Sequence, residues 1–155
     1  MLTEHIEQKF KNDMFEFVYA YARFEYCIKK NVEYSDEKKV EGKAVQPNWD
    51  GLVSLNKRSL TIDNIPSGKI LIDLKPKKQV FSREGWKEIV DTGNYLNNVV
   101  SALKAVRNNL FHGGKECESG FESSDRNMDL IRTGTKVINE MVVALRWDND
   151  FSARH

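Results

Sequence analysis

The feature of the sequence that most constrains the fold is an apolar stripe near its start. Between about Thr3 and Lys30 the apolar residues follow one another at steps of four, three, four, three and four positions. They are Phe10, Met14, Phe17, Tyr21, Phe24 and Ile28. Such steps place side chains on one face of an α-helix, whereas a half-buried strand alternates at every second residue. The spacing therefore predicts one long helix, of about 28 residues and about 42 Å.

Two further long helices are predicted in the second half of the chain. One starts near Ser82 and ends before Gly113 and Gly114, because glycine adopts the left-handed conformation that closes helices at little cost. Its stripe is Trp86, Ile89, Gly93, Leu96, Val100, Leu103, Arg107 and Leu110. The other runs from about Asp125 to Trp147, with Leu130, Val137, Met141 and either Ala144 or Leu145 facing inward.

The stretch between the first two long helices is less regular. Residues 31–47 are polar and read as a solvated loop, and Asn48 can cap a short helix from Trp49 to Leu60. From Leu60 to Leu74 the isoleucines alternate around a Pro-Ser-Gly turn, which suits a small hairpin, and an irregular loop fits nearly as well.

The predicted fold is an all-α, up-and-down bundle of about four helices, three of them long, with a loop-rich insertion after the first helix. A length of 155 residues suits one domain, which we place at residues 1–147, followed by a frayed tail at residues 148–155. The longest apolar run, Phe17 to Ala22, has six residues, whereas a membrane helix needs about 20. We therefore expect a cytoplasmic protein without a membrane segment.

Charge and motif content exclude several kinds of chemistry. With 24 basic and 23 acidic residues the net charge is +1, so any contact with nucleic acid needs a local basic patch. None of the three histidines lies in an H-E-x-x-H motif, and no C-x-x-C occurs, so we expect no metal site. No glycine-rich phosphate or dinucleotide loop is present, so we expect no cofactor. Cys27 and Cys117 are far apart and suit free thiols in a reducing compartment.

Arg107 breaks the apolar stripe of the second long helix, at a position where the pattern favours leucine or valine. A buried charge is costly unless it is paired or faces a polar cleft. His112 follows five residues later, in the last turn before the glycine pair, and Asn108 stands four residues before it, where its amide can orient the imidazole. The alternative for His112 is a helix-end histidine favoured only by the helix dipole.

The segment from Arg107 to His112 resembles the R-x(4–6)-H signature of HEPN domains, the higher eukaryote and prokaryote nucleotide-binding superfamily. In that signature a polar residue, often asparagine, follows the arginine, as Asn108 does here. The aromatic first helix is also similar to HEPN, in which an acidic residue often lies near the arginine; Glu25 is the candidate. The resemblance covers about half to two-thirds of the chain, at its two ends.

The resemblance implies a dimeric helical bundle and a metal-independent endoribonuclease of toxin or antiviral-defence type. In the implied reaction the ribose 2′-OH attacks the adjacent phosphate, leaving a 2′,3′-cyclic phosphate and a 5′-OH. Arg107 would bind the phosphate oxygens, and His112, with an ordinary pKa of about 6.5, would serve as acid or base. One chain supplies one such histidine, which favours a homodimer. The partners expected are RNA and an antitoxin resembling a nucleotidyltransferase.

Several residues have both a supporting and a structural interpretation. Glu25 can pair with Arg107, or with Lys29 one turn further along the helix. Lys104 and Lys115 can steer RNA, and the lysines at 75, 77 and 78 can form a phosphate patch or a solvated loop. The tyrosines at 19, 21 and 26 can stack on bases, or pack in the core or at an interface.

Two other functions remain open at this point. One is a non-catalytic HEPN module that binds nucleotide, RNA or a partner protein. The other is a helical protein-interaction domain in which Arg107 forms a buried structural ion pair. The last of these predicts that Arg107→Ala unfolds the protein, whereas the nuclease predicts a folded and inactive variant.

Overall fold

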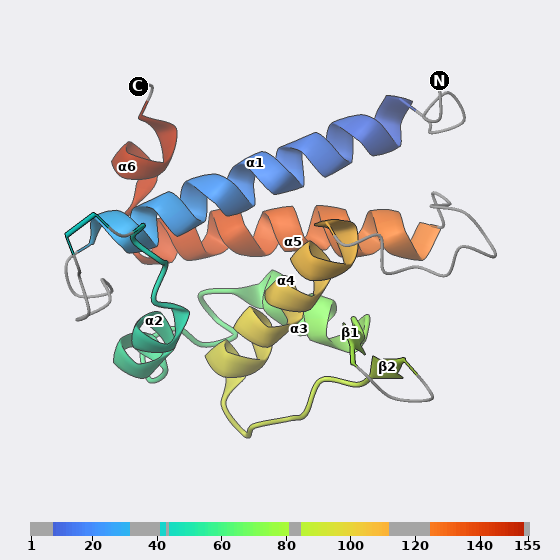
Figure 1. Ribbon diagram of the computed structural model, residues 1–155. Coiled ribbons are helices and arrows are strands. Elements are labelled where there is room, and N and C mark those ends of the chain that lie inside the picture. Colours follow the sequence, from blue (N-terminus) through green and yellow to red (C-terminus); the bar gives the residue numbers. More distant parts are fainter. Residues whose placement is uncertain (1–7, 32–40, 43, 81–84, 112–124, 154–155) are drawn as a thin grey trace.

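The part of the chain that the structure describes is a helical bundle with one small antiparallel strand pair (Figure 1). The computed structural model describes residues 8–31, 41–42, 44–80, 85–111 and 125–153. The elements in these ranges are α1 (Gln8–Lys30), α2 (Trp49–Asn56), α3 (Pro66–Asp73), β1 (Lys78–Gln79), β2 (Trp86–Lys87), α4 (Tyr95–Phe111), α5 (Asp125–Ala144) and α6 (Asp148–Ser152). The predicted all-α bundle with three long helices is confirmed, since α1, α4 and α5 have 23, 17 and 20 residues.

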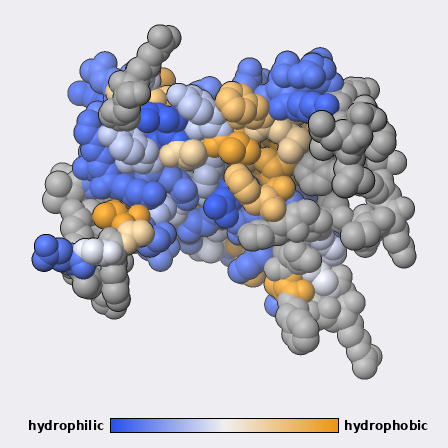
Figure 2. All heavy atoms as spheres, turned by 45° about the horizontal axis from the view of Figure 1, so that its top comes forward, coloured by the Kyte–Doolittle hydropathy of each residue, from blue (hydrophilic) through white to orange (hydrophobic). Residues whose placement is uncertain are grey.

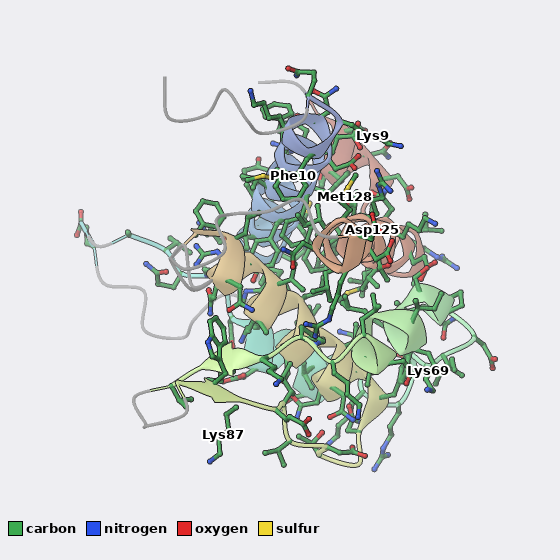
Figure 3. All side chains as sticks on the ribbon, turned by 90° about the vertical axis from the view of Figure 1, so that its right-hand side faces the viewer. Lys9, Phe10, Lys69, Lys87, Asp125 and Met128 are labelled. Carbon is green, nitrogen blue, oxygen red and sulfur yellow. The ribbon has the colours of Figure 1, made fainter. Side chains whose placement is uncertain are left out.

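The predicted stripe of α1 is its buried face. Phe10, Phe17 and Phe24 are fully buried, and Phe10 lies with Met128 between α1 and α5 (Figure 3). A methyl group added at Gly134 of α5 would lie 2.6 Å from the Phe17 ring, so the glycine allows the two helices to approach closely. No helix among the described residues is long and apolar enough to cross a bilayer.

The two longest helices are parallel neighbours. Asp13 of α1 forms an ion pair with Arg132 near the start of α5, at 2.7 Å, and Phe24 further along α1 packs on Trp147 just beyond the end of α5. Residue numbers in the two helices therefore increase in the same direction. The chain returns to the start of α5 through a crossover that contains α2, α3 and α4, rather than by direct up-and-down alternation of these two helices.

The predicted start of the second long helix near Ser82 is wrong. Helix α4 begins at Tyr95, and part of the preceding stretch forms β2, which pairs antiparallel with β1. Each of the two strands has two residues, so together they form a very short antiparallel pair beside the helices and not a second layer.

A turn and a cap immediately before α4 explain the late start. Gly93 has a φ of +72°, in the left-handed region, and its N–H donates to Asp91 Oδ1 at 2.8 Å. Asn94 Oδ1 accepts from the N–H of Asn97 at 3.0 Å, which satisfies one of the unpaired donors of the first turn. The sequence Asp-Thr-Gly-Asn contains both signals, but the apolar periodicity continues across them.

The hairpin predicted within residues 60–74 is also wrong, because this stretch contains α3. Pro66 occupies the first turn of α3, where its missing N–H costs nothing. Glu140 of α5 then caps the helix: its carboxylate accepts from the N–H of Ser67 at 3.0 Å and from the Ser67 hydroxyl at 2.6 Å. Leu71 is fully buried, so α3 faces the core through a residue outside the alternating set.

The predicted start of the short second helix, at Trp49, is confirmed. Asn48 Oδ1 accepts from the N–H of Gly51 at 2.9 Å, as a cap should. The helix ends at Asn56 rather than at Leu60, and Leu60 is buried beyond it.

We predicted a frayed tail at residues 148–155, and this prediction is wrong for residues 148–153. The last long helix ends at Ala144, and Arg146, with a φ of +59°, turns the chain into α6. Arg23 of α1 donates to the backbone carbonyl oxygens of Asp150, Phe151 and Ala153 at 2.6, 2.9 and 3.1 Å. These bonds hold the tail against α1.

Candidate functional site

Arg107 lies in the last two turns of α4, half-buried between aromatic side chains. Its guanidinium carbon is 4.8 Å from the ring centroid of Phe111, one turn further along the helix, and 5.9 Å from that of Tyr21 on α1. Its Nη1 donates to Asn108 Oδ1 at 3.0 Å. The arginine thus stands where α4 meets α1, and the polar residue after it holds one end of its guanidinium.

Among the described residues, no carboxylate neutralises Arg107. The ion pairs in this part of the chain are Lys30–Asp150, Lys69–Asp73 and Arg132–Asp13. Glu25, which was predicted to pair with either Arg107 or Lys29, pairs with neither. Its Oε1 instead accepts from the indole Nε1 of Trp49 at 3.3 Å. Trp49 is buried, and a buried indole N–H usually finds an acceptor, which explains the different partner.

The ring of Tyr21 that lies against the Arg107 guanidinium carries no charge at neutral pH. Burial raises the pKa of its hydroxyl well above the usual value of about 10, the negative charge of Glu25 raises it further, and the positive charge of Arg107 partly opposes both. At neutral pH the phenol is therefore protonated. Since only 4% of the residue is exposed, Tyr21 packs in the core rather than stacking on bases.

The other two tyrosines differ from each other. Tyr26 is covered on one face by the guanidinium of Arg23, at 4.7 Å. Tyr19 is 57% exposed and stacks on Phe15, which is 70% exposed, at 6.1 Å between ring centroids. Of the three candidates for base stacking or interface packing, Tyr19 therefore presents the most open ring.

Lys104 lies one turn before Arg107 and also sits over an aromatic ring. Its Nζ is 5.6 Å from the ring centroid of Trp49, and the Trp49 ring packs on that of Tyr21 at 5.5 Å. Lys104 borders an open cavity of about 210 Å³ at the start of α2. Among the described residues, the others that line it are Gln46, Pro47, Asn48, Trp49 and Asp50.

Two of the predicted site residues, His112 and Lys115, lie outside the described residues. The role of Asn108 in orienting His112 therefore stays a prediction, while its bond to Arg107 is established. Within the described ranges, no group of three His, Cys, Asp or Glu side chains is placed to hold a metal ion.

The lysine-rich loop is exposed and tied to the end of α4. The side chains at positions 75, 77 and 78 are exposed, as a solvated loop requires. Asn109 Nδ2 donates to the carbonyl oxygen of Lys77 at 2.8 Å, and Arg126 donates to that of Lys75 at 3.0 Å. The loop is thus fixed near the helix end that carries Arg107.

Large apolar side chains are exposed on α1 and at the end of α4. Phe15 and Tyr19 of α1 and Phe111 of α4, which is 53% exposed, are large side chains open to solvent. Figure 2, which turns α1 toward the viewer, shows apolar side chains gathered into a patch on this side of the molecule. Patches of this kind mark interaction surfaces more often than isolated exposed residues do.

The aromatic contacts of Arg107 and Lys104 are the part of the site that sequence reasoning missed. The contact with Phe111 has a signal in the sequence, since residues four apart share a helix face. The contacts with Tyr21 and Trp49 depend on how three helices meet.

A comparison of the chain with protein-family models, with curated proteins and with solved structures found no match.

Proposed function

We propose that this chain is a HEPN-type endoribonuclease that cleaves RNA without a metal ion, leaving 2′,3′-cyclic phosphate and 5′-OH ends. The observation that carries the proposal is the burial of Arg107 together with its hydrogen-bond partners. It is half-buried between two rings, and the described residues supply a single hydrogen-bond acceptor for it, Asn108. A guanidinium has five N–H donors and a permanent charge, and the described residues leave most of these donors to bind phosphate oxygens.

In the proposed reaction Arg107 binds the nonbridging oxygens of the scissile phosphate. The 2′-oxygen forms a bond to phosphorus as its proton passes to a base, and the bond from phosphorus to the 5′-oxygen breaks as that oxygen receives a proton from an acid. His112 can fill either role near neutral pH. Arg107 stabilises the negative charge that grows on phosphorus-bound oxygens in the transition state.

A homodimer would supply one histidine for each side of the phosphorus. The exposed side chains of Phe15, Tyr19 and Phe111 support this assembly, because they offer apolar surface, part of it at the Phe111 ring that contacts Arg107, on a chain with little net charge. The expected setting is the cytoplasm, in a toxin–antitoxin or antiviral system, with an antitoxin of the nucleotidyltransferase kind as a further partner.

The two alternatives differ in how they fit Arg107. A protein-interaction domain with a structural Arg107 ion pair is less well supported, because the described carboxylates do not pair with this arginine. A non-catalytic HEPN module that binds nucleotide, RNA or a partner protein would use the same guanidinium donors, and only an activity measurement separates it from the nuclease.

The test is cleavage of a mixed-sequence single-stranded RNA in the presence of EDTA, by the wild type, Arg107→Ala and the control Arg58→Ala. Arg58 is an exposed arginine beyond α2, so its removal changes the charge equally. We expect the wild type and the control to cleave, with cyclic phosphate on the products. Arg107→Ala should lose about 10²–10³-fold in rate, as the loss of one transition-state donor does in other enzymes.

Three results would contradict the nuclease. They are a requirement for Mg²⁺, products without a cyclic phosphate, and an Arg107→Ala variant as active as the control. RNA binding that depends on Arg107 but is not followed by cleavage would instead establish the non-catalytic module.

A further inference from the structure

We propose that the cavity beside Lys104 is a nucleobase subsite, which takes the base next to the phosphate held by Arg107. This inference rests on the proposed function for the identity of the substrate as RNA. The proposed subsite uses a different set of contacts, at the junction of α2 and α4. Such a subsite would make the protein prefer some RNA sequences over others.

The cavity presents both a cationic donor and an anionic acceptor. Lys104 brings up to three N–H donors and Asp50 a carboxylate that only accepts, and the two are not joined by an ion pair. A bare phosphate would satisfy Lys104 but would face the negative charge of Asp50. A ligand that offers an acceptor beside a donor satisfies both, and every nucleobase has such an edge.

The remaining lining residues fit the same ligand. Gln46 contributes an amide with donors and an acceptor, while Asn48 uses its Oδ1 to cap α2. A volume of about 210 Å³ is many times the roughly 10–15 Å³ that a cavity needs to hold one water molecule. That is room for a single planar ring system.

The position of the cavity relative to Arg107 suits one nucleotide. Lys104 and Arg107 are three residues apart on α4, and such residues are neighbours on a helix surface, about 5–6 Å apart between Cβ atoms. The rings beneath them, Trp49 and Tyr21, are themselves in contact at 5.5 Å between centroids. An RNA strand with a phosphate at Arg107 can therefore place an adjacent base beside Lys104.

A fixed pair of donor and acceptor selects among the bases. The four bases differ in the order of donors and acceptors along their edges, so the arrangement of Lys104 and Asp50 favours some over others. One good contact gives discrimination of about fivefold or more. We therefore expect the wild type to prefer particular bases at one position beside the cleaved bond.

The first experiment maps cleavage sites in a random-sequence RNA pool, in EDTA, for the wild type, Asp50→Asn, Lys104→Met and the control Lys136→Met. Lys136 is an exposed lysine of α5, outside the cavity lining. The wild type and the control should share a base preference of at least about fivefold that each cavity variant weakens or changes. Cleavage without base preference, or a preference that both cavity variants keep, would overturn the subsite.

A second experiment tests the subsite without using cleavage. The four uncharged ribonucleosides are titrated into the 15N-labelled wild type and Asp50→Asn, and the indole N–H signal of Trp49 is followed by NMR. Some nucleosides should move this signal more than others in the wild type and lose that effect in the variant. If no nucleoside moves it, the subsite is wrong even where RNA is cleaved; if RNA is not cleaved but the signal moves, the nuclease alone is wrong.

Discussion

At the residue scale, Arg107 combines a permanent charge with a mostly aromatic environment. The rings of Tyr21 and Phe111 attract the guanidinium through their negative faces, an interaction of about 0.5–1 kcal/mol when exposed and about 2 kcal/mol or more when desolvated. This contribution offsets part of the cost of half-burying the charge. Within the described part of the chain, this arrangement also leaves the N–H edge of the guanidinium without a carboxylate partner, which an ion pair with Glu25 would not.

A melting experiment tests whether Arg107 is structural. Because the described residues give it aromatic contacts and one neutral hydrogen bond, Arg107→Ala should cost about 1 kcal/mol of stability. In a domain of this size that lowers Tm by about 2–4 °C. Thermal melts followed by circular dichroism measure the change, with Arg58→Ala as the control. An unfolded Arg107→Ala protein would support the structural ion pair instead.

The sequence predicted part of this site. A charge in an apolar stripe singles out Arg107, and helical spacing brings Asn108 and Phe111 near it. The partner of Glu25 could not be foreseen, because it depends on the buried indole of Trp49, which lies 24 positions further along the chain. A pattern within one helix holds no information about which group from another helix needs an acceptor.

At the element scale, the apolar period predicted the long helices better than their ends. In α1 the stripe is the buried face, with Met14 alone among its six residues only partly buried. The start of α4 was misplaced because Trp86 and Ile89 continue the helical period by chance, while Asp91 and Gly93 already form a turn. Helix α3 was missed because its cap, Glu140, comes from a distant part of the chain.

The close contact of α5 with α1 gives a prediction about stability. Gly134→Ala should gain about 1 kcal/mol in helix propensity but lose about 1–3 kcal/mol, because the new methyl group would lie 2.6 Å from the buried Phe17 ring. We expect a net loss of about 1 kcal/mol, or about 2–4 °C in Tm. Lys136→Ala, an exposed change in the same helix, is the control. A variant that melts at or above the wild type would mean that the helices can separate at no cost.

At the scale of the whole molecule, the parallel packing of α1 and α5 places helices from the two ends of the sequence side by side, while the start of α1 and the last helix, α6, lie at opposite ends of the bundle (Figure 1). Local patterns could not predict this arrangement, because helix direction depends on the crossover through α2, α3 and α4. The outer face of α1 then stays open, with Phe15 and Tyr19 exposed on it.

This open face predicts the oligomeric state. Sedimentation equilibrium at micromolar concentration should give twice the 17.9 kDa mass of one chain, because a dimer buries Phe15 and Tyr19. Phe15→Asp should shift the protein to the monomer and reduce RNA cleavage with it. Val143→Asp, which changes a 64% exposed residue on α5, should remain dimeric. A monomeric wild type would count against a site shared between two chains.

The central claim is that Arg107 and His112 act on one transition state. The most direct measurement is the rate of RNA cleavage by His112→Ala, Arg107→Ala and the double variant, with folding checked by thermal melts. General acid–base catalysis supplies about 10²–10⁴-fold, so we expect a loss of that size in His112→Ala, and a double variant hardly slower than the slower single one. A His112→Ala protein that cleaves RNA at the wild-type rate would contradict the account.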